Sequence, residues 1–132
     1  MSYWDSVKHF KSSEFDSPDA PGSGATGMQE QFVRQLDAMR DRLSFPLVVT
    51  SGYRTPAHNV SVGGAADSDH TRGFCADVSV MSKIERAKIN QAAVAVGMRQ
   101  IAFGDRIVHL GSDPDRAEMV GIYHPGEPGR WY

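Results

Sequence analysis

The sequence lacks several features that would assign it to a special class of protein. Only one cysteine, Cys75, occurs in the 132 residues, so no internal disulfide can form. No apolar run approaches the roughly 20 residues that a membrane span requires. Lysine and arginine (14) nearly balance aspartate and glutamate (16), and the net charge of −2 gives no electrostatic reason to expect nucleic acid or an anionic membrane as a partner.

The N-terminus also lacks the basic and apolar regions of a Sec-type signal peptide, so we expect synthesis without export by that route. The length suits a single domain over residues 1–132, which we divide into an ordered lead-in loop at 1–27 and a core at 28–132. Residues 11–27 are rich in Ser, Gly, Pro and Asp, and we expect neither helix nor strand there, with a flexible tail as the alternative. No heptad pattern is present, and we expect a monomer.

Two segments show helical patterns. Residues 28–43 place Phe32, Leu36 and Met39 on one apolar stripe. Residues 82–96 begin with Ser82 and, three residues later, Glu85, the spacing of a capping box, and they end before Gly97.

Short apolar runs predict strands, and the fold class follows from their order. We expect strands at 47–50, 74–80, 98–103, 106–110 and 119–123, the third and fourth joined by a tight turn. Residues 51–69 are dense in turn-forming residues and predict a long irregular connection, which is typical of a functional loop. The pattern therefore predicts an α+β fold with a small antiparallel sheet and two main helices.

Three residues have the chemistry of a metal site. Alternation along 74–80 puts Asp77 on the face opposite Val78, and alternation along 106–110 does the same for His109. A turn at Arg72-Gly73 can fold His70 back towards them. Two imidazoles and one carboxylate leave a fourth tetrahedral position open, as in a catalytic zinc site. Spacing alone leaves a surface hydrogen bond as the alternative explanation.

A longer motif makes this interpretation more specific. The chain contains S-G-Y-R-T at 51–55, H-N at 58–59, S-x-H-x-x-G-x-x-x-D at 68–77, and then a strand that carries a second histidine. This order resembles the zinc D-alanyl-D-alanine carboxypeptidase and L-alanyl-D-glutamate endopeptidase family, which cuts peptidoglycan stem peptides and shares its fold with the zinc domain of hedgehog proteins. The resemblance covers roughly residues 8–123 and implies that fold here.

The resemblance also assigns roles to residues. It implies that His70, Asp77 and His109 bind Zn²⁺ and that Arg54 holds a substrate carboxylate or carbonyl oxygen. It implies that Ser68 bonds the substrate or orients the site. A structural salt bridge remains the alternative for Arg54, and a loop cap remains the alternative for Ser68. Cys75 stands where the family usually has a small residue, and we expect a buried small side chain there rather than a nucleophile.

The general base is the part of the family pattern that this chain lacks. Family members have a carboxylate three residues before the second histidine or two residues after it, and here those positions are Arg106 and Gly111. We expect Asp105 to serve instead, with Asp113 next and Asp69, Glu118 or no base as further alternatives. His124, in the C-terminal segment, is a candidate hydrogen-bond donor to the transition state.

The sequence therefore predicts a zinc-dependent peptidase acting on peptidoglycan stem peptides. Because the substrate lies outside the cytoplasm, we expect a phage or prophage lysin released at lysis or carried on a virion. The alternative is a non-catalytic zinc-bearing module that binds wall peptide or belongs to a phage structure. A closed structural zinc site is disfavoured because such sites use four protein ligands and the motif supplies three.

Overall fold

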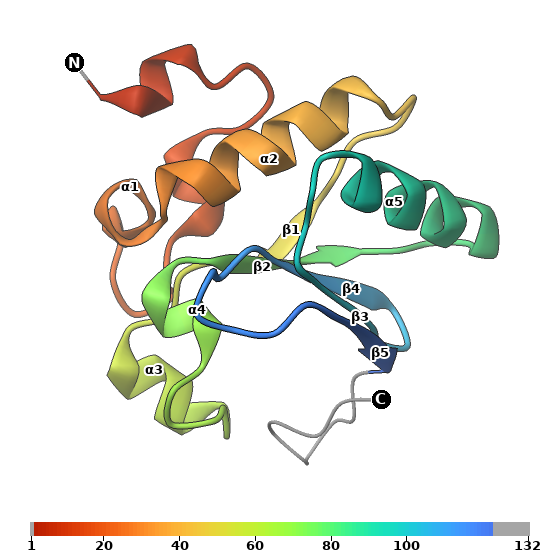
Figure 1. Ribbon diagram of the computed structural model, residues 1–132. Coiled ribbons are helices and arrows are strands. Elements are labelled where there is room, and N and C mark those ends of the chain that lie inside the picture. The colour runs from red at the N-terminus through yellow and green to blue at the C-terminus, as the bar shows by residue number, and fades with distance from the viewer. Residues whose placement is uncertain (1, 123–132) are drawn as a thin grey trace.

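The computed structural model describes residues 2–122 of the chain (Figure 1). Two short 3-10 helices, η1 (Tyr3–Ser6) and η2 (Ser12–Phe15), and the short helix α1 (Ser23–Gly27) come first. The later helices are α2 (Glu30–Asp41), α3 (Pro56–Ser61), α4 (Asp69–Arg72) and α5 (Lys83–Ala95). The strands are β1 (Val49–Ser51), β2 (Cys75–Ser79), β3 (Gln100–Phe103), β4 (Ile107–Gly111) and β5 (Met119–Ile122).

The five strands form one sheet in the order β1-β2-β4-β3-β5. The pairs β1–β2, β2–β4 and β3–β4 are antiparallel, which confirms the predicted α+β class. The last pair, β3–β5, is parallel, so the sheet is not wholly antiparallel as predicted. The reason is the path of the 112–118 loop. Gly111 at the end of β4 and Met119 at the start of β5 both pair with Gln100, so β5 begins at the same end of the sheet where β3 begins and runs in the same direction as β3.

The two faces of the sheet differ in chemistry. Figure 1 shows α2 and α5, the two main helices, on one side of the sheet and α3 on the other. The face towards α2 and α5 carries the core, in which Val78, Val108 and Leu110 are fully buried. Because strand side chains alternate, Asp77 and His109 point to the opposite face. The predicted alternation of β2 and β4 is therefore confirmed.

The lead-in is more regular than predicted. It holds η1, η2 and α1. The Asp16 carboxylate stabilises the start of α1, because it accepts hydrogen bonds from the backbone N–H groups of Gly22 and Gly24 at 2.9 and 2.8 Å. Phe15 is fully buried and belongs to the core. The prediction that 11–27 holds no helix was wrong, since these turns are too short to show an apolar period.

The 51–69 connection also contains helix where an irregular loop was predicted. Thr55 caps α3, its Oγ1 accepting from the His58 N–H at 3.1 Å, and Pro56 occupies the first helical position.

Ser82 caps α5 as predicted, with its Oγ 3.1 Å from the Glu85 nitrogen. The Glu85 side chain bonds the Met81 N–H rather than that of Ser82, so only half of the predicted capping box is formed. Within residues 2–122, no helix has the length and apolar character needed to cross a bilayer.

Candidate metal centre

The register of the sheet brings two of the predicted ligands together. Asp77 of β2 and His109 of β4 are direct partners, and His109 Nδ1 lies 2.9 Å from Asp77 Oδ1. Both residues are buried, each with 8% of its surface exposed. Directly opposed side chains in an antiparallel pair share one face of the sheet. The two donors therefore lie on the face away from the core.

The third predicted ligand comes from α4, a single helical turn. Gly73 has a φ of 77°, which favours glycine and ends this helix before β2 begins. Arg54 N donates to His70 O at 3.0 Å, and His70 Nδ1 donates to Gly52 O at 2.8 Å. The second bond requires a proton on Nδ1, so Nε2, which lies 3.5 Å from Asp77 Oδ2, is the ring nitrogen that can bind a metal ion. The S-G-Y-R segment thus orients His70.

A fourth side chain that could bind a metal lies near the two histidines. The Cys75 sulfur and one ring nitrogen each of His70 and His109 all lie within 4.8 Å of one another. Cys75 is fully buried, as predicted. Burial, followed by the nearby Asp77 carboxylate, raises the pKa of the Cys75 thiol well above its ordinary value. A neutral thiol in the metal-free protein agrees with the prediction that Cys75 is not a nucleophile.

The electrostatics of this cluster suit a cation. Burial by itself raises the pKa of Asp77, but hydrogen bonds to His109 and His70 and the charge of those rings outweigh it and hold that pKa well below its usual range. An ionised carboxylate is thus kept in a buried site among imidazoles. The donor set of two imidazoles, a carboxylate and a thiol fits Zn²⁺, which binds all three donor types.

His70, Asp77 and His109 line a cavity of about 230 Å³. Arg54, Ser68, Asp69 and Arg116 line the same cavity, and Val62 and Met119 give it an apolar part. A cavity that joins buried metal-binding side chains to two guanidinium groups, a hydroxyl and a carboxylate can hold a small polar ligand against a bound ion.

The sequence model of the peptidase M15 family matches residues 8–111. The chain belongs to the peptidase M15 family. The matched range contains His70, Asp77 and His109. A search of curated proteins finds no match to the chain. Because M15 peptidases depend on zinc, the protein is a zinc metallopeptidase, and the buried cluster is where its metal can bind.

Arg54 of this M15 peptidase is held at the edge of the metal centre. Its guanidinium donates to Asn59 Oδ1 and Ser51 Oγ, each at 3.3 Å, and its Nη2 lies 3.9 Å from Asp77 Oδ2. Asn59 is buried and also donates to Ala65 O at 2.7 Å, so it links Arg54 to the loop that follows α3. Ser68 caps α4 through its Oγ, which accepts from the His70 N–H at 3.2 Å.

The candidate bases occupy different places in the peptidase. Asp105 is exposed in the β3–β4 turn and is absent from the cavity lining. Asp113 is fully buried, and its carboxylate accepts from Arg72 and from the Asp115 N–H. Glu118 pairs with Arg99 at 3.4 Å, with 76% of its side chain exposed. Of the four predicted candidates, Asp69 alone lines the cavity, whereas His124 lies outside the described residues.

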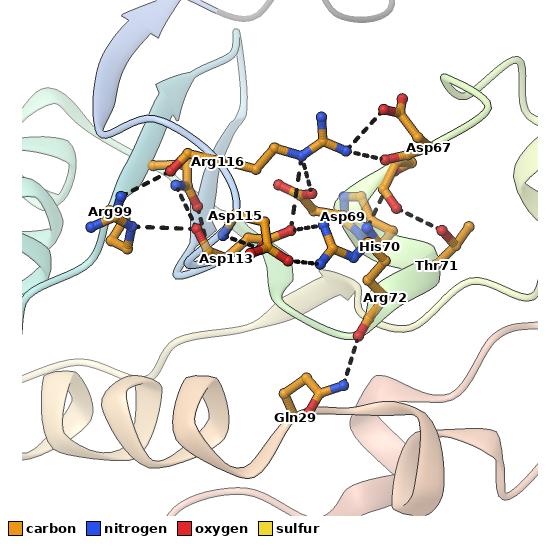
Figure 2. A network of polar contacts seen from close by, with 12 residues as sticks. Gln29, Asp67, Asp69, His70, Thr71, Arg72, Arg99, Asp113, Asp115 and Arg116 are labelled. Carbon is orange, nitrogen blue, oxygen red and sulfur yellow. Dashed lines mark hydrogen bonds and ion pairs between the residues drawn. The ribbon is translucent and has the colours of Figure 1, made fainter.

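Asp69 belongs to a polar network that sequence reasoning missed (Figure 2). Arg116 Nε donates to Asp69 Oδ1 at 3.0 Å, and Arg116 Nη2 lies 3.1 Å from Asp67 Oδ2. Burial and then the neighbouring Asp113 carboxyl raise the pKa of Asp69, although Arg116 opposes the change. The network ties the 112–118 loop to α4 across 47 residues of sequence, and no local spacing could have indicated it.

Proposed function

We propose that this metallopeptidase hydrolyses the stem peptides of peptidoglycan. One observation carries the proposal: Arg54 lines the same cavity as His70, Asp77 and His109. A stem peptide offers carboxylates and amide carbonyls in close succession, so it can place a carbonyl at the metal and a carboxylate at the guanidinium. The resemblance of the 51–77 motif to D-alanyl-D-alanine carboxypeptidases and L-alanyl-D-glutamate endopeptidases supports the same substrate class.

Arg54 would bind the substrate as an anion or through a carbonyl oxygen. Its side chain is 18% exposed, and its bonds to Ser51 and Asn59 hold the planar guanidinium in one orientation. A held guanidinium can donate two parallel hydrogen bonds to a carboxylate. The Ser68 hydroxyl accepts from His70 N and can donate its own hydrogen to a substrate oxygen at the cavity wall.

His70, Asp77 and His109 would hold the metal. When bound, Zn²⁺ supplies a Lewis acid and lowers the pKa of water in its coordination shell. We propose Asp69 as the carboxylate that accepts the proton, in place of Asp105, because Asp69 lines the cavity. Its raised pKa favours uptake of a proton, and the same carboxyl can then deliver that proton to the leaving amine.

The proposal leaves two candidate bonds in the stem peptide. D-Ala–D-Ala and L-Ala–D-Glu cleavage use the same donor set, and the apolar wall at Val62 and Met119 would select between them by shape. We further propose a phage or prophage lysin that reaches the wall after lysis-linked release or on a virion. The competing function, a wall-peptide binder without turnover, would keep Arg54 and the metal donors and lack an effective base.

Digestion of purified peptidoglycan tests the proposal. The zinc-loaded protein is incubated with the polymer, and the soluble products are identified by mass spectrometry beside a His70→Ala control. New stem-peptide fragments that are absent from the control support the enzyme and identify the bond. Intact polymer, with zinc measured in the protein, overturns catalysis and leaves the binding module.

A further inference from the structure

Cys75 is buried, but it is not among the hydrophobic residues that pack together as the core cluster. It lies on β2 two residues from Asp77, so both side chains share the face of the sheet that carries the metal centre. The clustered core residues of β2 are Ala76 and Val78, on the other face. Cys75 is 0% exposed all the same. Core packing therefore does not account for a thiol at this position.

The surroundings of Cys75 direct its sulfur towards the histidines. Its partner across β4 is Gly111, which has no side chain to fill the space on this face. The sulfur and one ring nitrogen each of His70 and His109 lie within 4.8 Å of one another. Donor atoms bound to one tetrahedral zinc ion stand roughly 3.6 Å apart, as bond lengths of about 2.3 Å to sulfur and about 2.0 Å to nitrogen require. Only a small closure of these buried side chains would bring all of them onto a single ion.

We propose that Cys75 is a fourth protein donor to the metal ion. The centre would then hold two imidazoles, one carboxylate and one thiolate, where the family motif alone supplies three donors. When an ion binds, the thiol proton passes to solvent and the sulfur carries the charge. A soft thiolate gives the centre a preference for thiophilic ions such as Cd²⁺ over hard ones such as Mg²⁺.

This inference rests on the metal centre and not on the proposed substrate. Four protein donors are compatible with hydrolysis only if zinc adds a fifth ligand, which catalytic zinc sites do in some states. Four donors that fully closed the site would instead favour the binding module. The role of Cys75 therefore bears on which of the two functions the chain performs.

Cobalt substitution of the full chain tests the assignment. Co²⁺ is added to metal-free wild type, Cys75→Ala and Cys75→Ser, and absorbance is recorded from the near ultraviolet through the visible. We expect an intense thiolate-to-cobalt charge-transfer band in wild type and its loss in both variants. The visible d–d bands should persist in the variants because His70, Asp77 and His109 still bind the ion.

Different results bear on Cys75, on the metal centre and on the proposed function. Visible bands without the near-ultraviolet band in wild type overturn the assignment and make Cys75 a packing residue. If the variants do not fold, cadmium NMR of wild type decides alone, because a sulfur donor shifts the cadmium resonance far downfield of a nitrogen and oxygen set. Failure of wild type to take up cobalt overturns the centre itself. Cobalt uptake without digestion of peptidoglycan removes only the proposed function.

Discussion

Asp77 and His109 face each other across the β2–β4 pair, with His109 Nδ1 2.9 Å from Asp77 Oδ1. The sheet register alone sets this contact, because a slip of one residue would turn His109 towards the core and Val108 towards the cavity. The same register puts Cys75 beside the pair. Two strands thus carry three of the four buried side chains that we propose as metal donors, and α4 carries the fourth, His70.

Loss of Asp77 is expected to abolish metal retention. Asp77→Ala removes the only carboxylate among the four donors and leaves two buried imidazoles without their anionic partner. Mutation of a residue that only hydrogen-bonds to a metal ligand lowers metal affinity by about 10–100-fold. Removal of a ligand itself should therefore lower it by more than about 100-fold. Zinc content after dialysis measures this. Ser79→Ala, on the same face of β2, is the matched control, and equal zinc loss in both variants would contradict the assignment.

Arg54 is expected to act on the substrate rather than on the metal. Arg54→Lys keeps the charge but cannot make two parallel hydrogen bonds, and hydrogen bonds to charged groups contribute about 1.5–3 kcal/mol each. We therefore expect kcat/KM on a stem peptide to fall by roughly 10–100-fold, with zinc content unchanged. Arg42→Lys, at an exposed position after α2, should behave as wild type. Unchanged kinetics of the Arg54 variant would return Arg54 to a structural role.

The choice between two carboxylates is open to direct measurement. Asp69→Asn should lower kcat by about 10²–10⁴-fold, the range of general base catalysis, with zinc still bound. Asp105→Asn should leave kcat near the wild-type value, because Asp105 is exposed in a turn outside the cavity. The reverse pattern would restore Asp105 as the base. Wild-type activity in both variants would exclude a base role for either residue.

Arg72 is expected to stabilise the fold through Asp113. The Asp113 carboxylate is fully buried, and Arg72 is its nearest cation, with Arg116 Nε 3.8 Å away. Arg72→Met should therefore lower the free energy of unfolding by about 1–3 kcal/mol, as loss of a partner to a buried polar group does. Urea unfolding measures the change. Lys88→Met, the same loss of a cation at an exposed site on α5, should change it by no more than about 0.5 kcal/mol.

Stability at high pH should depend on Tyr3. Burial, and then the Glu30 carboxylate, raise the pKa of Tyr3 from 10.0 to about 12 in the folded protein, where its hydroxyl donates to Met28 O at 3.2 Å. Between those two values the unfolded chain has lost the proton that the folded chain keeps. The contribution of Tyr3 is therefore complete below about pH 10 and is lost as pH rises towards 12. Urea unfolding of wild type and Tyr3→Phe across this range should converge, and a constant difference would contradict the prediction.

Local pattern determined much of the fold and the core of the site. The stripe of Phe32, Leu36 and Met39 predicted α2, and the Ser82 cap marked the start of α5, because such signals depend on residues only a few positions apart. The motif at 68–77 and the alternation around His109 identified the residues that the structure brings together. Strand alternation even put Cys75 on the face of Asp77, although the sequence alone did not place its sulfur near the histidines.

Only the tertiary structure decided the rest. The parallel β5, the approach of the Cys75 sulfur to both histidines, and the bond from Arg116 to Asp69 all depend on where chain segments pass each other. The sequence shows that carboxylates are missing from the family's usual base positions. It did not show which candidate lines the cavity, because Asp69 is placed there by the α4 turn and is held by a residue 47 positions later. Such contacts are set by long-range packing, which no local period or cap encodes.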